Sequence, residues 1–348
     1  MINQDIDILD LNEYNLSYDF LNSVIGIDVN ECYPYKNGFF IIDQNGNNYL
    51  IFKILERDVE KYIQIFDVLQ NINSINRSIQ GMHFFMGNKY FIDKSTGHYY
   101  VVFNYPNGEY IKWLDFNINS IKDILINFYN GSQDILKDLY NFNLKEDVKL
   151  LTIGDEVKEI DEYLLNIQNI EIFILHKYNK DRFDDLFLEN KTYMKDELIK
   201  IRKFFTSSKF KNYVSNHRNI RFINGNLSNK SFIFNNDRSY IINFYNASID
   251  LFIKDIGILS EKAIFNINMD EFKTFIINFL SNFEGNINEH IEMLFNYIRL
   301  NNRMFKWFNT QYKNIHYSGR KVDLDSKISE IYMYKQNIND FINILSFT

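Results

Sequence analysis

The sequence predicts an α+β protein with two lobes: a small β-rich lobe at the N-terminus and a larger, mainly helical lobe at the C-terminus. Three observations lead to this prediction. Short apolar runs with tight-turn signals gather in the first part of the chain, and apolar residues at helical spacing dominate the rest. One short group of strands interrupts that helical part. We expect the lobes to comprise residues 1–106 and 107–348.

The clearest element of the N-terminal lobe is a β-hairpin over residues 36–55. Two apolar runs flank Asn45-Gly46, a dipeptide that favours the tight turn between two strands. On the second strand, Phe52 and Lys53 face opposite sides because side chains alternate along a strand. A helix and a second pair of strands should follow, over residues 57–69, 83–92 and 98–105.

The C-terminal lobe is predicted from apolar residues three and four positions apart, the spacing that places them on one face of a helix. Five segments show this spacing: 118–142, 193–216, 269–283, 286–308 and 325–345. Between them we expect three short strands, over residues 220–224, 231–234 and 240–244.

Composition excludes several classes of protein. The 348 residues include 46% hydrophobic and 24% charged residues, which are ordinary globular values. The net charge of −7 disfavours a nucleic-acid partner. We find no apolar stretch of transmembrane length and no targeting signal, so we expect a cytoplasmic protein without a membrane partner. The single cysteine, Cys32, excludes an intramolecular disulfide, and we expect it to be a free thiol in a loop.

The segment 223–257 contains three short motifs. It begins Ile-Asn-Gly-Asn-Leu-Ser-Asn-Lys-Ser, continues through Ile242-Asn243-Phe244 and ends with Asp255-Ile256-Gly257. This pattern resembles the His-Gly-Asp-Leu-Ser-x-x-Asn, Ile-Asp-Phe and Asp-Leu-Gly motifs of aminoglycoside-phosphotransferase-type kinases. Among these it is most similar to the CotS family of bacterial spore coat proteins, whose further motif matches Tyr245 to Gly257. The resemblance implies a protein-kinase-like two-lobed fold, with a degenerate catalytic-loop hairpin over 220–257.

The resemblance also implies roles for particular residues. The position of the catalytic base is Asn226, the two Mg²⁺-ligand positions are Ser231 and Asn243, and the leading His of the motif is Asn224. An amide is not a general base near neutral pH, and losing the base typically costs about 10²–10⁴ in rate. Mg²⁺ sites depend on carboxylate charge. The resemblance therefore predicts a pseudokinase with no catalytic residue, no metal ligand and no ATP or Mg²⁺ cofactor.

Some residues of the pattern are retained. Lys53 matches the lysine that contacts the nucleotide phosphates in such kinases, within the segment 49–53. Gly225 and Asp255 match positions with a structural role in the family. The family's Asp that corresponds to Asp255 is hydrogen-bonded to the backbone of the catalytic loop. We expect Gly225 and Asp255 to support the loop that corresponds to the catalytic loop. Lys53 is the residue that would contact the phosphates of a bound nucleotide.

Two kinds of function follow from this resemblance. In the first, the protein is a structural or assembly component of the bacterial endospore coat, made in the mother cell, with other spore coat proteins as partners. In the second, it is a small-molecule phosphotransferase of the aminoglycoside, sugar or choline type, or a nucleotide-binding sensor. The sequence leaves the coat partner and the occupant of the cleft open.

Overall fold

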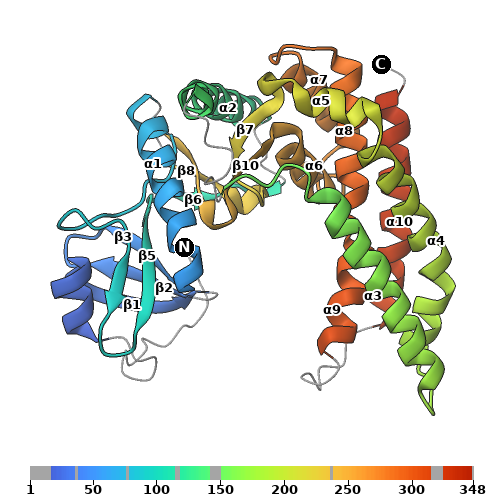
Figure 1. The fold of residues 1–348 in the computed structure, drawn as a ribbon, viewed down its shortest axis with the longest axis horizontal. Helices are drawn as coiled ribbons and strands as arrows, with labels where there is room; N and C mark the ends of the chain where they lie inside the picture. The colour runs from blue at the N-terminus through green and yellow to red at the C-terminus, as the bar shows by residue number, and fades with distance from the viewer. Residues whose placement is uncertain are drawn as a thin grey trace. The chain divides into compact units, whose positions relative to one another are not determined.

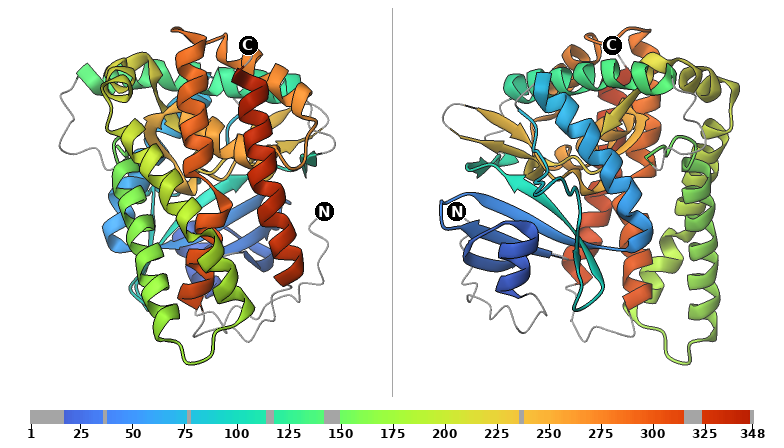
Figure 2. Two further views of the ribbon diagram at one scale, coloured as in Figure 1. Left: turned by 90° about the vertical axis from the view of Figure 1, so that its right-hand side faces the viewer. Right: turned by 60° about the vertical axis from the view of Figure 1, so that its left-hand side comes forward.

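The computed structural model describes residues 17–35, 38–75, 78–113, 118–141, 150–235, 238–314 and 324–346 (Figures 1 and 2). These residues fall into two compact units. The first comprises residues 1–151 and 221–249, and the second comprises residues 152–220 and 250–348. The boundary predicted between residues 106 and 107 lies inside the first unit.

A five-stranded antiparallel sheet forms the N-terminal part of the first unit, in the order β1-β2-β3-β5-β4. Its strands are β1 (Val29–Tyr35), β2 (Gly38–Asp43), β3 (Asn48–Ile54), β4 (Phe91–Asp93) and β5 (His98–Tyr105). The predicted hairpin is confirmed as β2 and β3, with Gly46 at a φ of 79° in the turn. Glycine suits this position because it has no Cβ to oppose a positive φ.

The first turns of the described chain cover one face of this sheet. The helix η2 (Phe20–Ile25) packs with Ile51 of β3 and Tyr100 of β5. Cys32 belongs to the same apolar cluster and is 3% exposed on β1, so the expectation of a thiol in a loop is wrong. Burial raises the pKa of its thiol to about 11, which makes a reactive thiolate unfavourable.

Two helices, α1 (Val59–Ile75) and α2 (Ile118–Asn141), complete the N-terminal part of the first unit. The predicted helix over 57–69 therefore exists, but it begins two residues later and runs six residues further. The two helices approach closely at Gly131, where a Cβ would lie 3.6 Å from Ile72 Cγ2.

The predicted group of short strands is confirmed, with small shifts of the boundaries. It consists of β7 (Ile220–Ile223), β8 (Phe232–Phe234), β9 (Ser239–Ile241) and a further strand, β10 (Ser248–Leu251). β9 pairs with β8, and β8 pairs with β6 (Glu109–Tyr110), which follows β5 in the chain.

The segment 78–81 joins this hairpin to the five-stranded sheet. The backbone N–H of Gln80 donates to Ile241 O at 2.9 Å, and Asn104 N–H of β5 donates to Gly81 O at 2.9 Å. Backbone pairing thus explains why the hairpin belongs to the same compact unit as the N-terminal sheet, although more than 100 residues separate them.

The second unit is helical (Figure 2). Its helices are α3 (Glu156–His176), α4 (Arg182–Phe205), α5 (Ser208–Ser215), α6 (Phe252–Ala263), α7 (Met269–Leu280), α8 (Ile287–Leu300), α9 (Arg303–Asn314) and α10 (Leu324–Ser346). The segment predicted as one helix over 193–216 is two helices, because Ser207 accepts a hydrogen bond from Phe210 N–H and caps a new start. The segment 286–308 likewise divides after Leu300.

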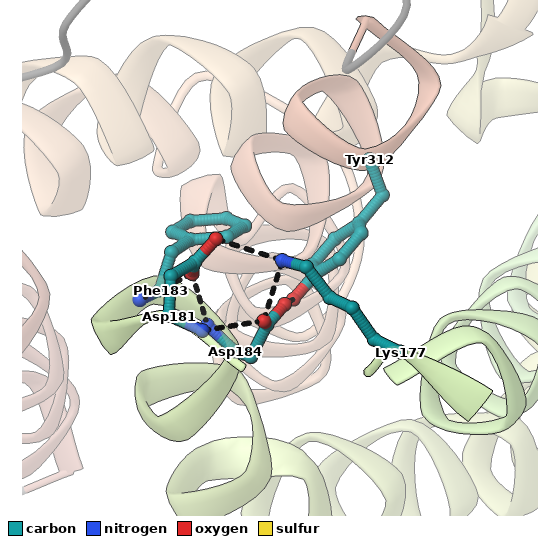
Figure 3. A network of polar contacts seen from close by, with 5 residues as sticks. All are labelled: Lys177, Asp181, Phe183, Asp184 and Tyr312. Carbon is teal, nitrogen blue, oxygen red and sulfur yellow. Dashed lines mark hydrogen bonds and ion pairs between the residues drawn. The ribbon is translucent and has the colours of Figure 1, made fainter. Parts of the chain in front are cut away.

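The turn between α3 and α4 carries a polar network (Figure 3). Lys177 Nζ donates to Asp181 at 2.7 Å and to Asp184 at 2.6 Å, and Tyr312 OH donates to Asp184 at 2.9 Å. Asp181 also accepts from the N–H groups of Phe183 and Asp184, so it caps α4. The network therefore ties the turn to α9.

None of the described helices has the length and apolar character needed to cross a membrane.

Candidate functional site

The loop after β7 is shaped by two of the motif residues. Asn224 is fully buried, and its Nδ2 donates to Ile242 O at 2.9 Å, which holds the start of the loop against the residue that follows β9. Gly225 has a φ of +78°, and a Cβ at this position would lie 2.2 Å from Asn246 O. Only glycine avoids both the strained φ and this overlap. The loop therefore needs glycine at position 225 for its backbone conformation.

Asn226, at the position that the sequence resemblance assigns to a catalytic base, is half-buried in this loop. Its backbone N–H donates to Asn224 Oδ1 at 3.3 Å, and its Nδ2 lies 3.5 Å from Tyr245 OH. A carboxamide can donate and accept hydrogen bonds, but it does not take a proton near neutral pH. Asn226 can therefore form hydrogen bonds with a bound group but cannot take a proton from it.

Ser231, at the position that the resemblance assigns to the first metal ligand, makes hydrogen bonds within the loop itself. It is 1% exposed, and its Oγ accepts from Ser228 N–H at 3.1 Å and donates to Asn226 O at 3.4 Å. These bonds close the short helix η6 (Asn229–Ser231). The Ser231 hydroxyl therefore stabilises the loop, and because it is neutral it supplies no negative charge to a cation.

Asn243, at the position that the resemblance assigns to the second metal ligand, follows β9 in the left-handed conformation, with φ 69° and ψ 47°. It is 7% exposed. Its Nδ2 donates to Lys230 O at 2.8 Å, and its backbone N–H donates to Gln80 Oε1 at 2.8 Å. Its Oδ1 is buried without a hydrogen-bond partner in the described structure.

This unpartnered oxygen is the feature of the loop that fits a cation. Carbonyl oxygens of Asn are ordinary ligands of hard divalent cations, and Mg²⁺ commonly completes its coordination with water and substrate phosphates. The described residues contain no group of three or more His, Cys, Asp or Glu side chains placed to hold a metal. Asn243 Oδ1 could therefore serve as one neutral ligand to a cation that is held mainly by a bound nucleotide.

The structure does not bring Lys53 to this loop. Lys53 is exposed on β3, and its Nζ donates to His98 Nε2 at 2.8 Å. Its neighbour Phe52 lies on the other face of β3, where its ring is 5.7 Å from that of Tyr245. Phe52, rather than Lys53, is thus the β3 side chain that contacts the segment after Asn243.

Tyr62 on α1 contacts the same segment. Its hydroxyl donates to Tyr245 O at 3.3 Å. Burial, with smaller contributions from Asp58 and Tyr245, raises the pKa of Tyr62 to about 12, so the phenol stays protonated at neutral pH. Tyr62 is therefore a hydrogen-bond donor that orients the chain after the loop and not a base.

Asp255 lies in the second unit. It is fully buried in the first turn of α6, where a carboxylate interacts favourably with the helix N-terminus. The sequence resemblance implies that Asp255 accepts a hydrogen bond from a backbone N–H of the loop, and this stays a prediction. Two residues later, a Cβ at Gly257 would lie 2.6 Å from Tyr297 Cβ on α8, so glycine permits the close packing of α6 and α8.

Sequence reasoning missed Gln80. It is 2% exposed and comes from a segment with no motif, 163 residues before Asn243. Gln80 also borders a cavity of about 320 Å³ at the end of β5, whose lining side chains are uncharged. The residues that line it are Asn47, Asn48, Tyr49, Ile79, Gln80, Gly81, Asn104, Tyr105, Pro106, Asn107 and Tyr240.

Comparisons with known proteins identify the fold. No family model and no curated protein matches the sequence. Among solved structures, the aminoglycoside phosphotransferase from Alicyclobacillus acidocaldarius superposes with a TM-score of 0.69 and 13% identity, over 97% of this chain and 98% of that chain. Spectinomycin phosphotransferase in complex with ADP and spectinomycin gives a TM-score of 0.62 and 12% identity, over 94% and 97% of the chains. Amicoumacin kinase in complex with AMP-PNP and Ca²⁺ gives 0.60 and 11%, over 95% and 94%.

These comparisons contradict the prediction of a pseudokinase, because the similar structures are phosphotransferases and kinases. Phosphoryl transfer depends mainly on positioning and electrostatic stabilisation, and a side-chain base is one contribution among several. Neutral residues at Asn226, Ser231 and Asn243 are therefore not by themselves evidence of an inactive protein. The chain has the two-lobed α+β, protein-kinase-like fold of the aminoglycoside phosphotransferases.

Proposed function

We propose that this protein is a nucleotide-dependent phosphotransferase that acts on a small molecule. The observation that supports it best is the buried, unpartnered Oδ1 of Asn243 at the end of β9, within a fold shared with nucleotide-bound phosphotransferases. An unpaired buried carbonyl oxygen costs about 1–3 kcal/mol. A cation bound with a nucleotide would satisfy it.

In this proposal, the side chains of the loop position the reactants and do not exchange protons with them. Asn226 orients the acceptor hydroxyl, and Gly225 allows the loop to pass close to Asn246 O. A bound Mg²⁺ would neutralise charge on the transferred phosphoryl group. The bond from the γ-phosphorus to ADP breaks, the bond to the acceptor oxygen forms, and the hydroxyl proton passes to water.

The acceptor is proposed to be a small hydroxyl compound. Spectinomycin is bound in one similar structure, and another similar structure is an ethanolamine kinase from Plasmodium vivax, with a TM-score of 0.53 and 16% identity. Because these proteins differ widely in acceptor while sharing the fold, the fold alone does not select one compound. A panel of aminocyclitols, amino alcohols and sugars covers the proposed class.

The experiment is a two-stage assay of the purified full chain. Thermal shift and calorimetry with AMP-PNP, with and without Mg²⁺, measure nucleotide binding, and γ-³²P-labelled ATP with the acceptor panel measures transfer. We expect Mg²⁺-dependent stabilisation, of roughly 2.7 kcal/mol at 100 times the dissociation constant. A labelled product from at least one acceptor would support the proposal. Absence of both binding and transfer would refute it.

A location in the endospore coat is a second proposal, which is compatible with the first. It is supported by the resemblance of Tyr245 to Gly257 to the spore coat family, and it would give the protein other coat proteins as partners. Mass spectrometry of washed, purified spores and of vegetative cells tests it. Detection only in vegetative cells would exclude this location.

A further inference from the structure

Gln80 has an arrangement that packing alone does not require. Its side chain is 2% exposed, and its Oε1 accepts from the backbone N–H of Asn243 at 2.8 Å. Because a backbone N–H is always a donor, the oxygen of the carboxamide must face it, which sets the orientation of the group. The other end, Nε2, is buried without a partner in the described structure.

Asn243 is held from two sides. Lys230 O accepts from its Nδ2, and Gln80 Oε1 accepts from its backbone N–H. These two bonds set both the backbone and the side chain, and they leave Oδ1 as the atom without a partner. Asn243 is also one of two non-glycine residues with positive φ in the described chain, the other being Met86. Such a conformation persists only where surrounding contacts support it.

We propose that Gln80 is a positioning residue that holds Asn243 so that its Oδ1 can meet a nucleotide-bound cation. This inference rests on the proposed function, and it adds to the proposed site a residue that lies outside the hairpin of β8 and β9. Gln80 acts through Asn243. Its Oε1 accepts from the backbone N–H of Asn243 and so holds the left-handed backbone of that residue, while the bond from Asn243 Nδ2 to Lys230 O sets the orientation of its side chain. An unpaired buried amide end is costly, and native proteins contain few of them, which favours a functional reason for this glutamine.

The test compares two variants with one control. Gln80→Leu removes the oxygen that accepts from Asn243 N–H, whereas Gln80→Glu keeps an oxygen at that position. Gln133→Leu makes the same exchange elsewhere in the first unit, where Gln133 accepts from Arg221 at 3.0 Å. Calorimetry measures the affinity of each protein for AMP-PNP with Mg²⁺ and for adenosine, which has no phosphate and recruits no cation.

We expect Gln80→Leu to weaken Mg²⁺-dependent AMP-PNP binding tenfold or more, while adenosine binding stays within twofold. Gln80→Glu should restore most of the affinity, and Gln133→Leu should leave it unchanged. Equal losses for AMP-PNP and adenosine, or a Gln80→Leu protein with unchanged AMP-PNP affinity, would overturn the inference while leaving the proposed function standing. A wild-type protein that binds neither AMP-PNP nor adenosine would refute both.

Discussion

Replacing Lys254 by methionine should destabilise the second unit strongly. Lys254 lies on α6, and its Nζ is 2.6 Å from Asp250 Oδ2 and 3.6 Å from Glu156 Oε1. Asp250 is fully buried and Glu156 is 1% exposed. Thr152 Oγ1 also donates to Asp250 at 2.7 Å, and Tyr297 OH donates to Glu156 at 2.8 Å. Methionine keeps most of the volume of the lysine stem, so the main loss is the positive charge between two buried carboxylates.

The expected cost is about 3–5 kcal/mol, the range found when one partner of a buried ion pair is removed. Burial alone would lower the pKa of Lys254, but Asp250 and Glu156 outweigh it and raise that pKa, so the lysine is charged at all relevant pH values. The pKa of Glu156 is raised, first by burial and then by Asp250, while Lys254 opposes the rise. Without Lys254, the pKa of Glu156 should rise further.

This reasoning predicts a pH dependence. When the pKa of a carboxyl group is higher in the folded state than in the unfolded state, its contribution to the free energy of unfolding is fully present below the unfolded-state pKa. That contribution is lost as the pH rises through the folded-state pKa. The difference between wild type and Lys254→Met should therefore be largest near pH 8 and should shrink towards pH 5, where Glu156 can bind a proton.

Urea and thermal unfolding at pH 8 and pH 5 measure this difference. For units of this size, about 2–4 °C per kcal/mol predicts a fall in Tm of roughly 10 °C at pH 8. Lys158→Met, on the exposed face of α3, is the control and should change stability by no more than about 0.5 kcal/mol. A cost below about 1 kcal/mol at pH 8, or the same cost at both pH values, would refute the reasoning from a buried charge cluster.

Three further outcomes are expected. Asn226→Asp should raise phosphotransfer by about 10²-fold or more, because it supplies a general base, while Asn88→Asp on an exposed turn should have no effect in the same labelled-ATP assay; equal rates would argue against an acceptor at Asn226. Gly257→Ala should lower the free energy of unfolding by about 1–3 kcal/mol through overlap with Tyr297, and an unchanged free energy of unfolding would contradict the close packing of α6 and α8. His290 is 1% exposed, and burial lowers its pKa. Because the folded-state pKa of His290 is lowered, its imidazole binds a proton more readily in the unfolded chain than in the folded protein. The free energy of unfolding should therefore fall from pH 7 to pH 5, and urea titrations should show a smaller fall for His290→Gln.

Local signals in the sequence predict much of the fold. The turn at Asn45-Gly46, the alternating residues of β3 and the apolar faces of the later helices depend on contacts within a few residues, so they are visible without a tertiary structure. The errors are also local in origin. Apolar spacing continues across residues 206–207, although α4 ends at Phe205 and Ser207 caps the start of α5. Helices α3 and α6 were missed altogether.

The motifs identify the loop, but they do not describe its surroundings. Asn226, Ser231 and Asn243 are identified from the resemblance to the kinase motifs, and the structure places the first two in the loop after β7 and the third just after β9. Lys53, predicted for the same site, faces away from it. The alternation of β3 already places Lys53 opposite Phe52, but which of the two faces the loop depends on how the sheet is covered.

The sequence by itself determined the α+β class, the hairpin of β2 and β3, the group of short strands β7, β8 and β9, and the neutral residues at the positions that the resemblance assigns to the base and the metal ligands. Only the tertiary structure decided which side chains meet those positions. Gln80 reaches Asn243 across 163 residues, and Lys254 joins Asp250 to Glu156 across about 100. No short-range pattern encodes such pairings, because they arise only when strands pair and helices pack and so bring together polar groups that lie far apart in the chain.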